Sequence, residues 1–357
     1  MKLTDFTWEE FSQLSMPEKV ECFKREDDGF PGHTLFAQQF DRETLDRLCN
    51  LATKIRKIAK KRDGMLFLNS LLAHKRAMLY FSQPSSRTFL SFYSACQIMG
   101  LKVAEVRDAA TSSEFKGESK EDSIRTFSSY FDLIIMRTQE KGLAEHMAWT
   151  LSNSERPLPI INAGSGKDQH PTQALLDIYT LKRSFEDNGG LKNRSIMYVG
   201  DLLRGRTVRS LSNLLMNYEN IEHIFVAPPE LQIKQDILDM LAANGSKYSV
   251  LTDMRERLAD VDAVYMTRIQ DEWDKSKGES ARIDISSYKI GKKEMDMMKE
   301  TAVLLHPLPR RDEISTDCDH DPRAMYWRQM RNGMWIRAAL IAATFGLANT
   351  ILSYDAE

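Results

Sequence analysis

One feature constrains the fold of this chain more than any other: short apolar runs alternate with amphipathic segments along its length. Such alternation is typical of βα units built around parallel sheets. The apolar runs form a first series at 77–82, 101–106, 132–137 and 157–164, and a second at 195–201, 223–228, 248–253, 261–268 and 302–307. We predict an α/β protein of two doubly wound parallel-sheet domains with an interdomain active-site cleft, and we expect the first series to be buried strands.

Breaks in this alternation indicate where the domains begin and end. The 357 residues exceed the ~100–150 of one typical core. The pattern breaks after Gly164, and a helix is predicted from about His170. From Gly333 the chain is apolar around most of a helical circumference, which predicts a buried helix returning to the first domain. The predicted parts are an N-terminal extension at 1–32, a first domain at 33–168 completed by 333–357, and a second domain at 169–332, with a polar loop at 271–284.

Charge and cysteine usage exclude several classes of protein. The net charge is -2, with 49 basic and 51 acidic side chains, so no whole-chain basic field favours nucleic acid. The four cysteines are scattered without a CxxC pair, which predicts neither a zinc site nor a disulfide framework and favours a reducing cytoplasm. The N-terminus is acidic, and no apolar run reaches the ~18 residues of a membrane span. We expect a cytoplasmic protein without nucleic-acid or membrane partners.

The segment 80–92 predicts a phosphate site. Its apolar strand passes through a Pro-containing turn into a helix that begins near Ser85 and Ser86. A helix N-terminus presents free N–H groups and partial positive charge, to which Ser85, Ser86, Arg87 and Thr88 add three hydroxyls and a guanidinium. For this tetrapeptide alone, an ordinary serine cap beside a solvated arginine is the plainer alternative.

Polar residues at other strand ends support the phosphate site. Arg137 and Arg268 each close an apolar run, and Arg206 closely follows one. Open α/β sheets bind ligands at these ends, so three arginines together indicate a polyanionic substrate pair. Polar turns also lie at 168–173 and 306–313. His170 and Gln173 are three residues apart and would share one face of a first helical turn, although His170 alone would more often be a core or capping residue.

These residues together resemble the transcarbamylase family over about residues 33–350. The motifs SSRT at 85–88, MRT at 136–138 and HPTQ at 170–173 are similar to the family's carbamoyl phosphate motifs. Four further segments are similar to those of its aspartate-using branch: KGES at 116–119, GRTVRS at 205–210, MTRIQ at 266–270 and HPLPR at 306–310. The ornithine branch usually carries a cysteine where Pro307 stands.

The resemblance implies roles for particular residues and no metal or organic cofactor. The phosphate would be held by Ser85, Ser86, Arg87, Thr88 and Arg137. The carbamoyl oxygen would be polarised by Thr88, Arg137 and His170. The carbamoyl NH₂ would be held by Gln173 and the backbone carbonyls of Pro307 and Leu308. Arg206, Arg268 and Gln270 would bind L-aspartate. Ser112 and Lys116, the latter also touching aspartate, would come from a neighbouring subunit of a homotrimer with shared active sites. Catalysis would rest on Arg87, Thr88, Lys116, Arg137 and His170.

Departures from the family pattern leave alternatives open. Gln83, Phe89 and Trp273 stand where charged residues are frequent, so the acceptor pocket could be reshaped for another amino acid such as ornithine. A catalytically silent homologue is a second alternative. A dinucleotide-binding protein is a third, although VGDLLRG at 199–205 lacks the GxGxxG turn. The N-terminal extension could pack on the core or contact another chain, and regulatory chains, their effects and any assembly beyond the trimer are left open.

Overall fold

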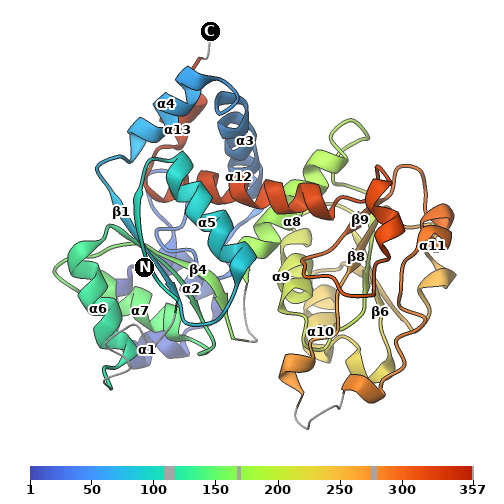
Figure 1. The fold of residues 1–357 in the computed structure, drawn as a ribbon. Helices are drawn as coiled ribbons and strands as arrows, with labels where there is room; N and C mark the ends of the chain where they lie inside the picture. Colours follow the sequence, from blue (N-terminus) through green and yellow to red (C-terminus); the bar gives the residue numbers. More distant parts are fainter. Residues whose placement is uncertain (108–116, 167–169, 275–279, 356–357) are drawn as a thin grey trace. The chain divides into compact units, whose positions relative to one another are not determined.

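The structure is a computed structural model that describes residues 1–107, 117–166, 170–274 and 280–355 (Figure 1). The chain forms two compact units: unit 1 is Met1–Leu176 with Asn332–Glu357, and unit 2 is Asp177–Arg331. The chain therefore changes unit within helices α8 (Pro171–Ser184) and α12 (Tyr326–Thr344), and not in the polar turn that precedes α8. The first turns of α8 belong to unit 1 because buried side chains such as Leu176 pack beside Gly333 of α12.

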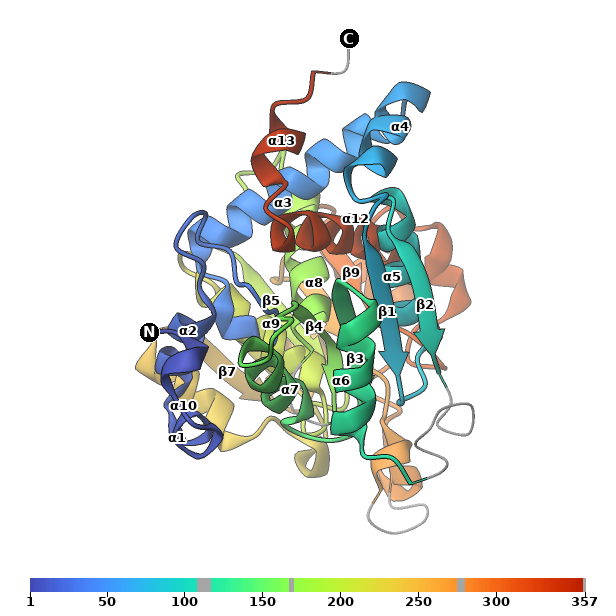
Figure 2. The same ribbon diagram turned by 90° about the vertical axis from the view of Figure 1, so that its left-hand side faces the viewer.

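Unit 1 contains a four-stranded parallel sheet in the order β2-β1-β3-β4 (Figure 2). The strands are β1 (Arg76–Phe81), β2 (Lys102–Val106), β3 (Leu133–Thr138) and β4 (Ile160–Ser165). Helices α6 (Lys120–Tyr130) and α7 (Leu143–Ser152) cover one face, where Met78, Tyr80, Ile134 and Met136 are buried. Helix α5 (Ser86–Ile98) and α12 lie on the other face. The sheet is thus doubly wound, as predicted.

One expectation about this sheet is wrong. Strands β1, β3 and β4 are almost wholly buried, but β2 alternates between exposed and half-buried residues. The reason is its position at the end of the strand order, where β2 pairs with β1 alone, whereas β4 at the other end is also bridged through Ile161 by Thr34. An edge strand needs fewer apolar residues than a central one, and the lysine and glutamate in this run are consistent with that place.

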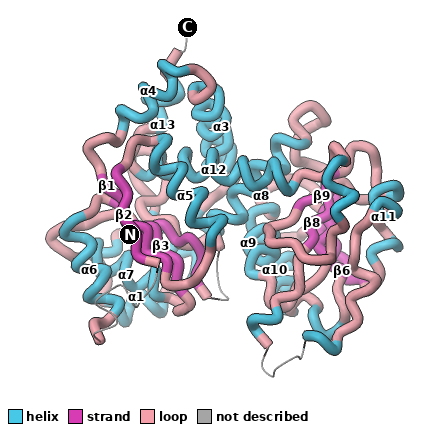
Figure 3. Tube along the Cα trace, in the orientation of Figure 1, coloured by secondary structure: helices cyan, strands magenta, loops and turns pink. Residues whose placement is uncertain are grey.

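Unit 2 contains a five-stranded parallel sheet in the order β7-β6-β5-β8-β9, which Figure 3 shows in magenta. Its strands are β5 (Ser195–Val199), β6 (Glu222–Val226), β7 (Lys247–Leu251), β8 (Ala263–Met266) and β9 (Val303–Leu305). One face packs on a cluster that includes α11 (Lys292–Met297). On the other, the Tyr265 hydroxyl donates to Asp177 of α8, and Tyr198 lies beside Ser212 of α9 (Arg206–Leu215). Helix α10 (Gln235–Ala243) lies between β6 and β7 in the chain.

The N-terminal extension packs on the core of unit 1. It forms α1 (Trp8–Gln13) and α2 (Met16–Phe23), which place Phe11 and Phe23 among the buried residues of α7 and β4. An ion pair of 2.6 Å joins Lys19 to Glu145 of α7. Of the two alternatives left by the sequence, the structure therefore shows packing on the core.

The C-terminal segment is not the single helix predicted from Gly333. Helix α12 already begins at Tyr326 and ends at Thr344, and a short α13 (Ala348–Leu352) follows. Gly346 separates them with φ of +70°, a conformation that favours glycine. Helix α13 packs on α3 (Arg42–Ile58), and Tyr354 stacks on Phe67 of α4 (Arg62–Leu71) at 3.9 Å between ring centroids. Across the residues that the structure describes, none of the helices is long and apolar enough to cross a membrane.

Candidate active site

The predicted phosphate loop lies where β1 leads into α5. Helix α5 begins at Ser86 after an extended Ser85, whose side chain forms no capping hydrogen bond among the described residues. This observation argues against the ordinary serine cap. Helical geometry leaves the N–H groups of Ser86, Arg87 and Thr88 without acceptors inside the helix. Thr88 is buried while Ser86 is exposed, and buried Phe89 and Phe92 anchor the first turns. The buried aromatic side chains therefore anchor a helix start of the kind that binds anions.

Arg137 lies at the end of β3, next to this loop. The backbone N–H of Gln83 donates to the carbonyl of Arg137 at 3.3 Å, which places the turn after β1 against the end of β3. Arg137 as a whole is 7% exposed; its Nη1 donates to the carbonyl of Ala163 at 3.1 Å and lies 3.2 Å from Nε2 of His170. A guanidinium only donates, so Nε2 accepts, which leaves the proton of a neutral imidazole on Nδ1.

Gly164 allows this arrangement. It lies at the end of β4 with φ of +122°, and a Cβ there would be 2.6 Å from Nη1 of Arg137 and 3.3 Å from Cδ2 of His170. The guanidinium thus occupies the space that a side chain at position 164 would fill. Asn162 fixes the turn, because its Oδ1 accepts the N–H of Gly164 at 2.8 Å.

His170 and Gln173 begin α8. The Gln173 N–H donates to the carbonyl of His170 at 3.0 Å, and the two side chains are 8% and 4% exposed respectively. We use "phosphate site" for Ser85, Ser86, Arg87, Thr88, Arg137, His170 and Gln173, all of which lie in unit 1. The predicted contributors Ser112 and Lys116 lie outside the described residues.

The predicted acceptor residues lie in unit 2, and we use "acceptor site" for Arg206, Arg268 and Gln270. Arg206 is the first residue of α9. Burial lowers its pKa to about 10, and the nearby negative charge of Glu272 partly opposes that shift. Arg206 therefore stays charged at neutral pH but is poorly solvated, a condition that favours binding of a carboxylate.

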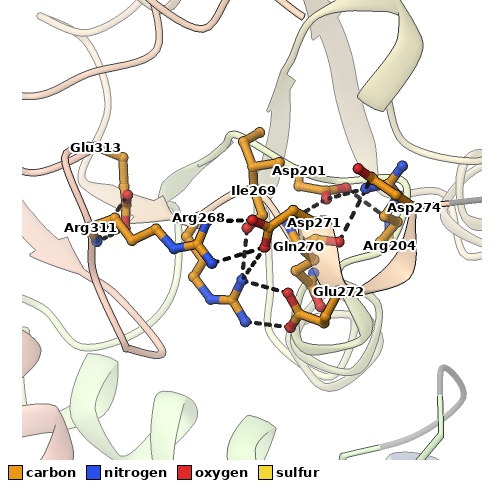
Figure 4. Close-up of polar contacts among 10 residues, drawn as sticks. All are labelled: Asp201, Arg204, Arg268, Ile269, Gln270, Asp271, Glu272, Asp274, Arg311 and Glu313. Carbon is orange, nitrogen blue, oxygen red and sulfur yellow. Dashed lines mark hydrogen bonds and ion pairs between the residues drawn. The ribbon is translucent and has the colours of Figure 1, made fainter. Parts of the chain in front are cut away.

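Arg268 binds a carboxylate of its own chain (Figure 4). Both terminal nitrogens of its guanidinium pair with Glu272, with 2.8 Å between Nη1 and Oε2. Nη1 also donates to the carbonyl of Ile269 at 2.8 Å and lies 3.8 Å from Asp271. We call residues 268–274 the acceptor segment. The part of the predicted loop 271–284 that the structure describes here includes a 3-10 turn at Asp271–Trp273.

Asp201 and Arg204 hold the middle of the acceptor segment. The fully buried carboxylate of Asp201, just beyond β5, accepts the N–H of Gln270 at 3.0 Å and that of Arg204 at 3.1 Å. Arg204 donates to the carbonyl of Gln270 at 3.1 Å and to Asp274 at 2.9 Å (Figure 4). Burial raises the pKa of Asp201, although these N–H groups and Arg204 draw it down. The backbone of Gln270 is thus fixed on both its N–H and its carbonyl.

The turn after β9 contains the predicted carbonyl donors Pro307 and Leu308. Leu308 has φ of +56°, a strained conformation for a side chain of this size. Its N–H donates to Nδ1 of buried His306 at 2.7 Å, and Nε2 of His306 lies 2.7 Å from Glu313. Burial would raise the pKa of Glu313, but the hydrogen bond and charge of His306 together with backbone N–H groups outweigh burial and lower that pKa. His306 and Glu313 thus hold Leu308 in its strained conformation.

The sequence analysis gave no role to Gly164, Asp201, Arg204 or Glu272, and it placed His306 and Glu313 in a polar turn at 306–313 without a role of their own. Asp201 follows a strand directly, so the rule that selected the arginines could have found it. In the part of the chain that the structure describes, no group of three or more His, Cys, Asp or Glu side chains could hold a metal ion.

Known proteins are similar to this chain over both of its units. Residues 32–183 match the family model of the aspartate/ornithine carbamoyltransferase carbamoyl-P binding domain, and residues 192–344 match that of the Asp/Orn binding domain. The chloroplastic aspartate carbamoyltransferase of Oryza sativa subsp. japonica is 40% identical over 318 residues, which are 87% of this chain and 84% of the relative.

Solved structures of aspartate transcarbamoylases are also similar. The catalytic subunit from M. jannaschii has a TM-score of 0.76 at 34% identity and covers 88% of this chain and 98% of its own. The Trypanosoma cruzi enzyme in complex with N-(phosphonacetyl)-L-aspartic acid has a TM-score of 0.77 at 35% identity, covering 87% and 95%. Two matching domain models and relatives of this identity place the chain in one family: it belongs to the aspartate/ornithine carbamoyltransferases.

Proposed function

We propose that this chain transfers the carbamoyl group of carbamoyl phosphate to L-aspartate, giving N-carbamoyl-L-aspartate and phosphate, a step of pyrimidine biosynthesis. One observation carries the choice of acceptor: the carboxylate of Glu272 pairs with Arg268, and its negative charge also raises the pKa of Arg206. Two arginines near one carboxylate suit an acceptor with two negative groups. The side-chain ammonium of ornithine would be repelled by the same two cations.

The phosphate site suits the donor. The helix N-terminus, Ser85, Ser86, Arg87 and Thr88 would bind the phosphoryl oxygens, because N–H groups, hydroxyls and a guanidinium all donate to anions. Arg137 would bind at the junction of phosphate and carbamoyl groups. His170 would donate from Nδ1 to the carbamoyl oxygen, since its Nε2 accepts from Arg137.

The chemistry needs no covalent intermediate on the protein. The neutral amine of aspartate attacks the carbamoyl carbon and the carbonyl oxygen gains negative charge. Phosphate then leaves with the bonding electrons and takes up the proton that the amine loses, which gives N-carbamoyl-L-aspartate and hydrogen phosphate. Donors fixed around that oxygen and the phosphate lower the barrier; loss of one such donor typically costs about 10²–10³ in rate. Gln173 and the carbonyls of Pro307 and Leu308 would orient the carbamoyl NH₂, and the fixed backbone of Leu308 suits that task.

An acceptor screen tests the function and its two alternatives. With labelled carbamoyl phosphate, the chain should carbamoylate aspartate and not ornithine. Transfer to ornithine or another amine in place of aspartate would favour the reshaped-pocket alternative. No transfer to any acceptor would favour the silent homologue. Arg87→Ala should abolish turnover, and N-(phosphonacetyl)-L-aspartic acid should compete with carbamoyl phosphate, as expected of a compound that joins both substrates.

We also propose a homotrimer in which Ser112 and Lys116 complete the phosphate site of a neighbour, as the family resemblance implies. Native mass measurement tests the assembly. Mixing two inactive variants, Lys116→Ala and Arg137→Ala, tests the sharing: hybrid particles should regain activity only if the two residues serve one site from different subunits. No recovery in hybrids of confirmed composition would contradict the shared site.

A cytoplasmic location is part of the same proposal. All four cysteines are buried and free, so the fold does not depend on an oxidising compartment. Fractionation of cells with an antibody against the chain would check the location, and recovery in an organelle would contradict it.

A further inference from the structure

We infer that Asp271 and Arg311 are positioning residues for the acceptor, because their ion pair fixes the acceptor segment against the turn that holds Leu308. The inference rests on the proposed function for its link to aspartate. Neither residue is among those predicted to touch a substrate. The pair is bidentate, with 2.9 Å for Nη1 to Oδ2 and 2.9 Å for Nη2 to Oδ1 (Figure 4). Such geometry fixes orientation as well as distance.

Arg311 is itself held on the side of the turn. Its backbone N–H donates to both carboxylate oxygens of Glu313, at 3.0 and 3.1 Å. Glu313 binds His306, and His306 accepts the N–H of Leu308. A continuous series of hydrogen bonds thus runs from Leu308 to the acceptor segment. Displacement of Arg311 would therefore affect the acceptor segment directly and Leu308 only through two buried residues.

Packing alone does not fix the acceptor segment. A pocket of about 60 Å³ lies beside it, and its lining includes Ile269, Arg311 and Glu313. On this measure one water needs roughly 10–15 Å³, so the space could hold a few waters. Ile269 of the acceptor segment therefore borders open volume, and polar contacts must set the position of the segment. Asp201 and Arg204 fix Gln270, while Asp271 is fixed by Arg311.

The charges predict that the two residues are not equivalent. Asp271 lies between Arg311 and Arg268, with 3.8 Å to Nη1 of Arg268. Without Arg311, the carboxylate of Asp271 would be left to Arg268 and would compete with the substrate for it. Without the charge of Asp271, the bridge is lost but the competitor is lost too. Removing Arg311 should therefore harm aspartate binding more than neutralising Asp271.

The test compares Arg311→Leu, Asp271→Asn and the double variant. Arg311→Leu should raise KM for aspartate about fivefold with little change in kcat. This ratio corresponds to the largest free energies that exposed ion pairs usually contribute. Asp271→Asn should raise it less, and the double variant should return to the Asp271→Asn value. Arg257→Leu is the matched control, since Arg257 forms a similar bidentate pair with Glu222 in the same unit, at 3.2 and 3.1 Å.

Hydrogen exchange separates this inference from the proposed function. In Arg311→Leu the amides of 268–274 should exchange faster than in the unaltered chain, whereas Arg257→Leu should leave them unchanged. Unchanged exchange in Arg311→Leu would overturn the inference whatever the activity of the chain. The inference would also be overturned if the two single variants raised KM equally and their effects added in the double variant. Such a result would mean that the carboxylate of Asp271 does not compete with aspartate for Arg268. An unaltered chain that does not use aspartate would contradict the proposed function instead.

Discussion

Gly164 offers the sharpest test of the phosphate site. Replacing it with alanine adds one methyl group at the end of β4, where the new Cβ would lie 2.6 Å from Nη1 of Arg137. An ordinary contact requires at least ~3.4 Å, so the guanidinium must move by roughly 0.8 Å or more. The guanidinium is the far end of a flexible side chain and can turn aside without a shift of the backbone. Its movement would break the bonds to Ala163 and His170.

The expected effect therefore falls on catalysis more than on folding. A misplacement of about 1 Å at a reacting group can cost roughly 10²-fold, so kcat/KM for carbamoyl phosphate should fall by about that factor. The φ of +122° adds a backbone cost of about 1–3 kcal/mol to the free energy of unfolding. Steady-state kinetics at saturating aspartate, with urea unfolding of the same samples, measure both effects.

Gly142→Ala provides the control. Gly142 also lies in unit 1 with a positive φ, of +79°, but a Cβ there would meet nothing within 4 Å. That variant should lose stability and keep its kcat/KM. If a folded Gly164→Ala variant retains kcat/KM within about threefold, Arg137 is not held for catalysis in the way described, and the reasoning is refuted.

Three further predictions concern unit 2 and the N-terminal extension. Asp201→Asn should raise KM for aspartate and lower the free energy of unfolding by about 1–3 kcal/mol. The reason is that the N–H groups of Arg204 and Gln270 donate to different oxygens of the carboxylate, and an amide has only one oxygen. Kinetics and urea titration measure the two effects, and an unchanged KM would contradict the prediction. Phe11→Ala should cost about 3–5 kcal/mol of stability with kcat unchanged, measured by thermal unfolding and assay of the folded fraction. Arg311 lowers the pKa of Asp271, so the stability from this pair is present above the ordinary aspartate pKa and is lost as the pH falls through the lowered value. The difference in urea midpoint between the unaltered chain and Asp271→Asn should begin to shrink below about pH 4 and vanish only below the lowered pKa.

The strands could be predicted from the sequence because apolar runs of strand length are a local signal. Each of the nine runs contains a strand, with ends that differ by a few residues. Burial was harder to predict: the run at 101–106 is apolar enough for a strand, but its edge position follows from the strand order, which no single run encodes. The start of α12 was missed for a related reason, since its first turn, from Tyr326, carries polar residues that resemble a loop.

The candidate site divides in the same way. Arg137 and His170 could be selected because strand ends and helix starts are visible in the sequence, and the structure brings them to 3.2 Å. Glu272 and Arg311 could not be selected from the sequence, because they lie in irregular segments that show no hydrophobic periodicity. Gly164 was invisible for another reason: its importance lies in a side chain that it lacks, and only the position of Arg137 reveals it.

The packing of the N-terminal extension has a consequence for how such a chain can change. The family model begins at residue 32, yet Leu3, Phe11 and Phe23 are part of the core of unit 1. The core of unit 1 therefore includes residues outside the region that the family models match. The aromatic side chains of the N-terminal extension are enclosed by α7 and β4. Loss of the extension would therefore expose apolar surface on α7 and β4 to water. An addition of this kind becomes difficult to reverse, whatever first favoured it.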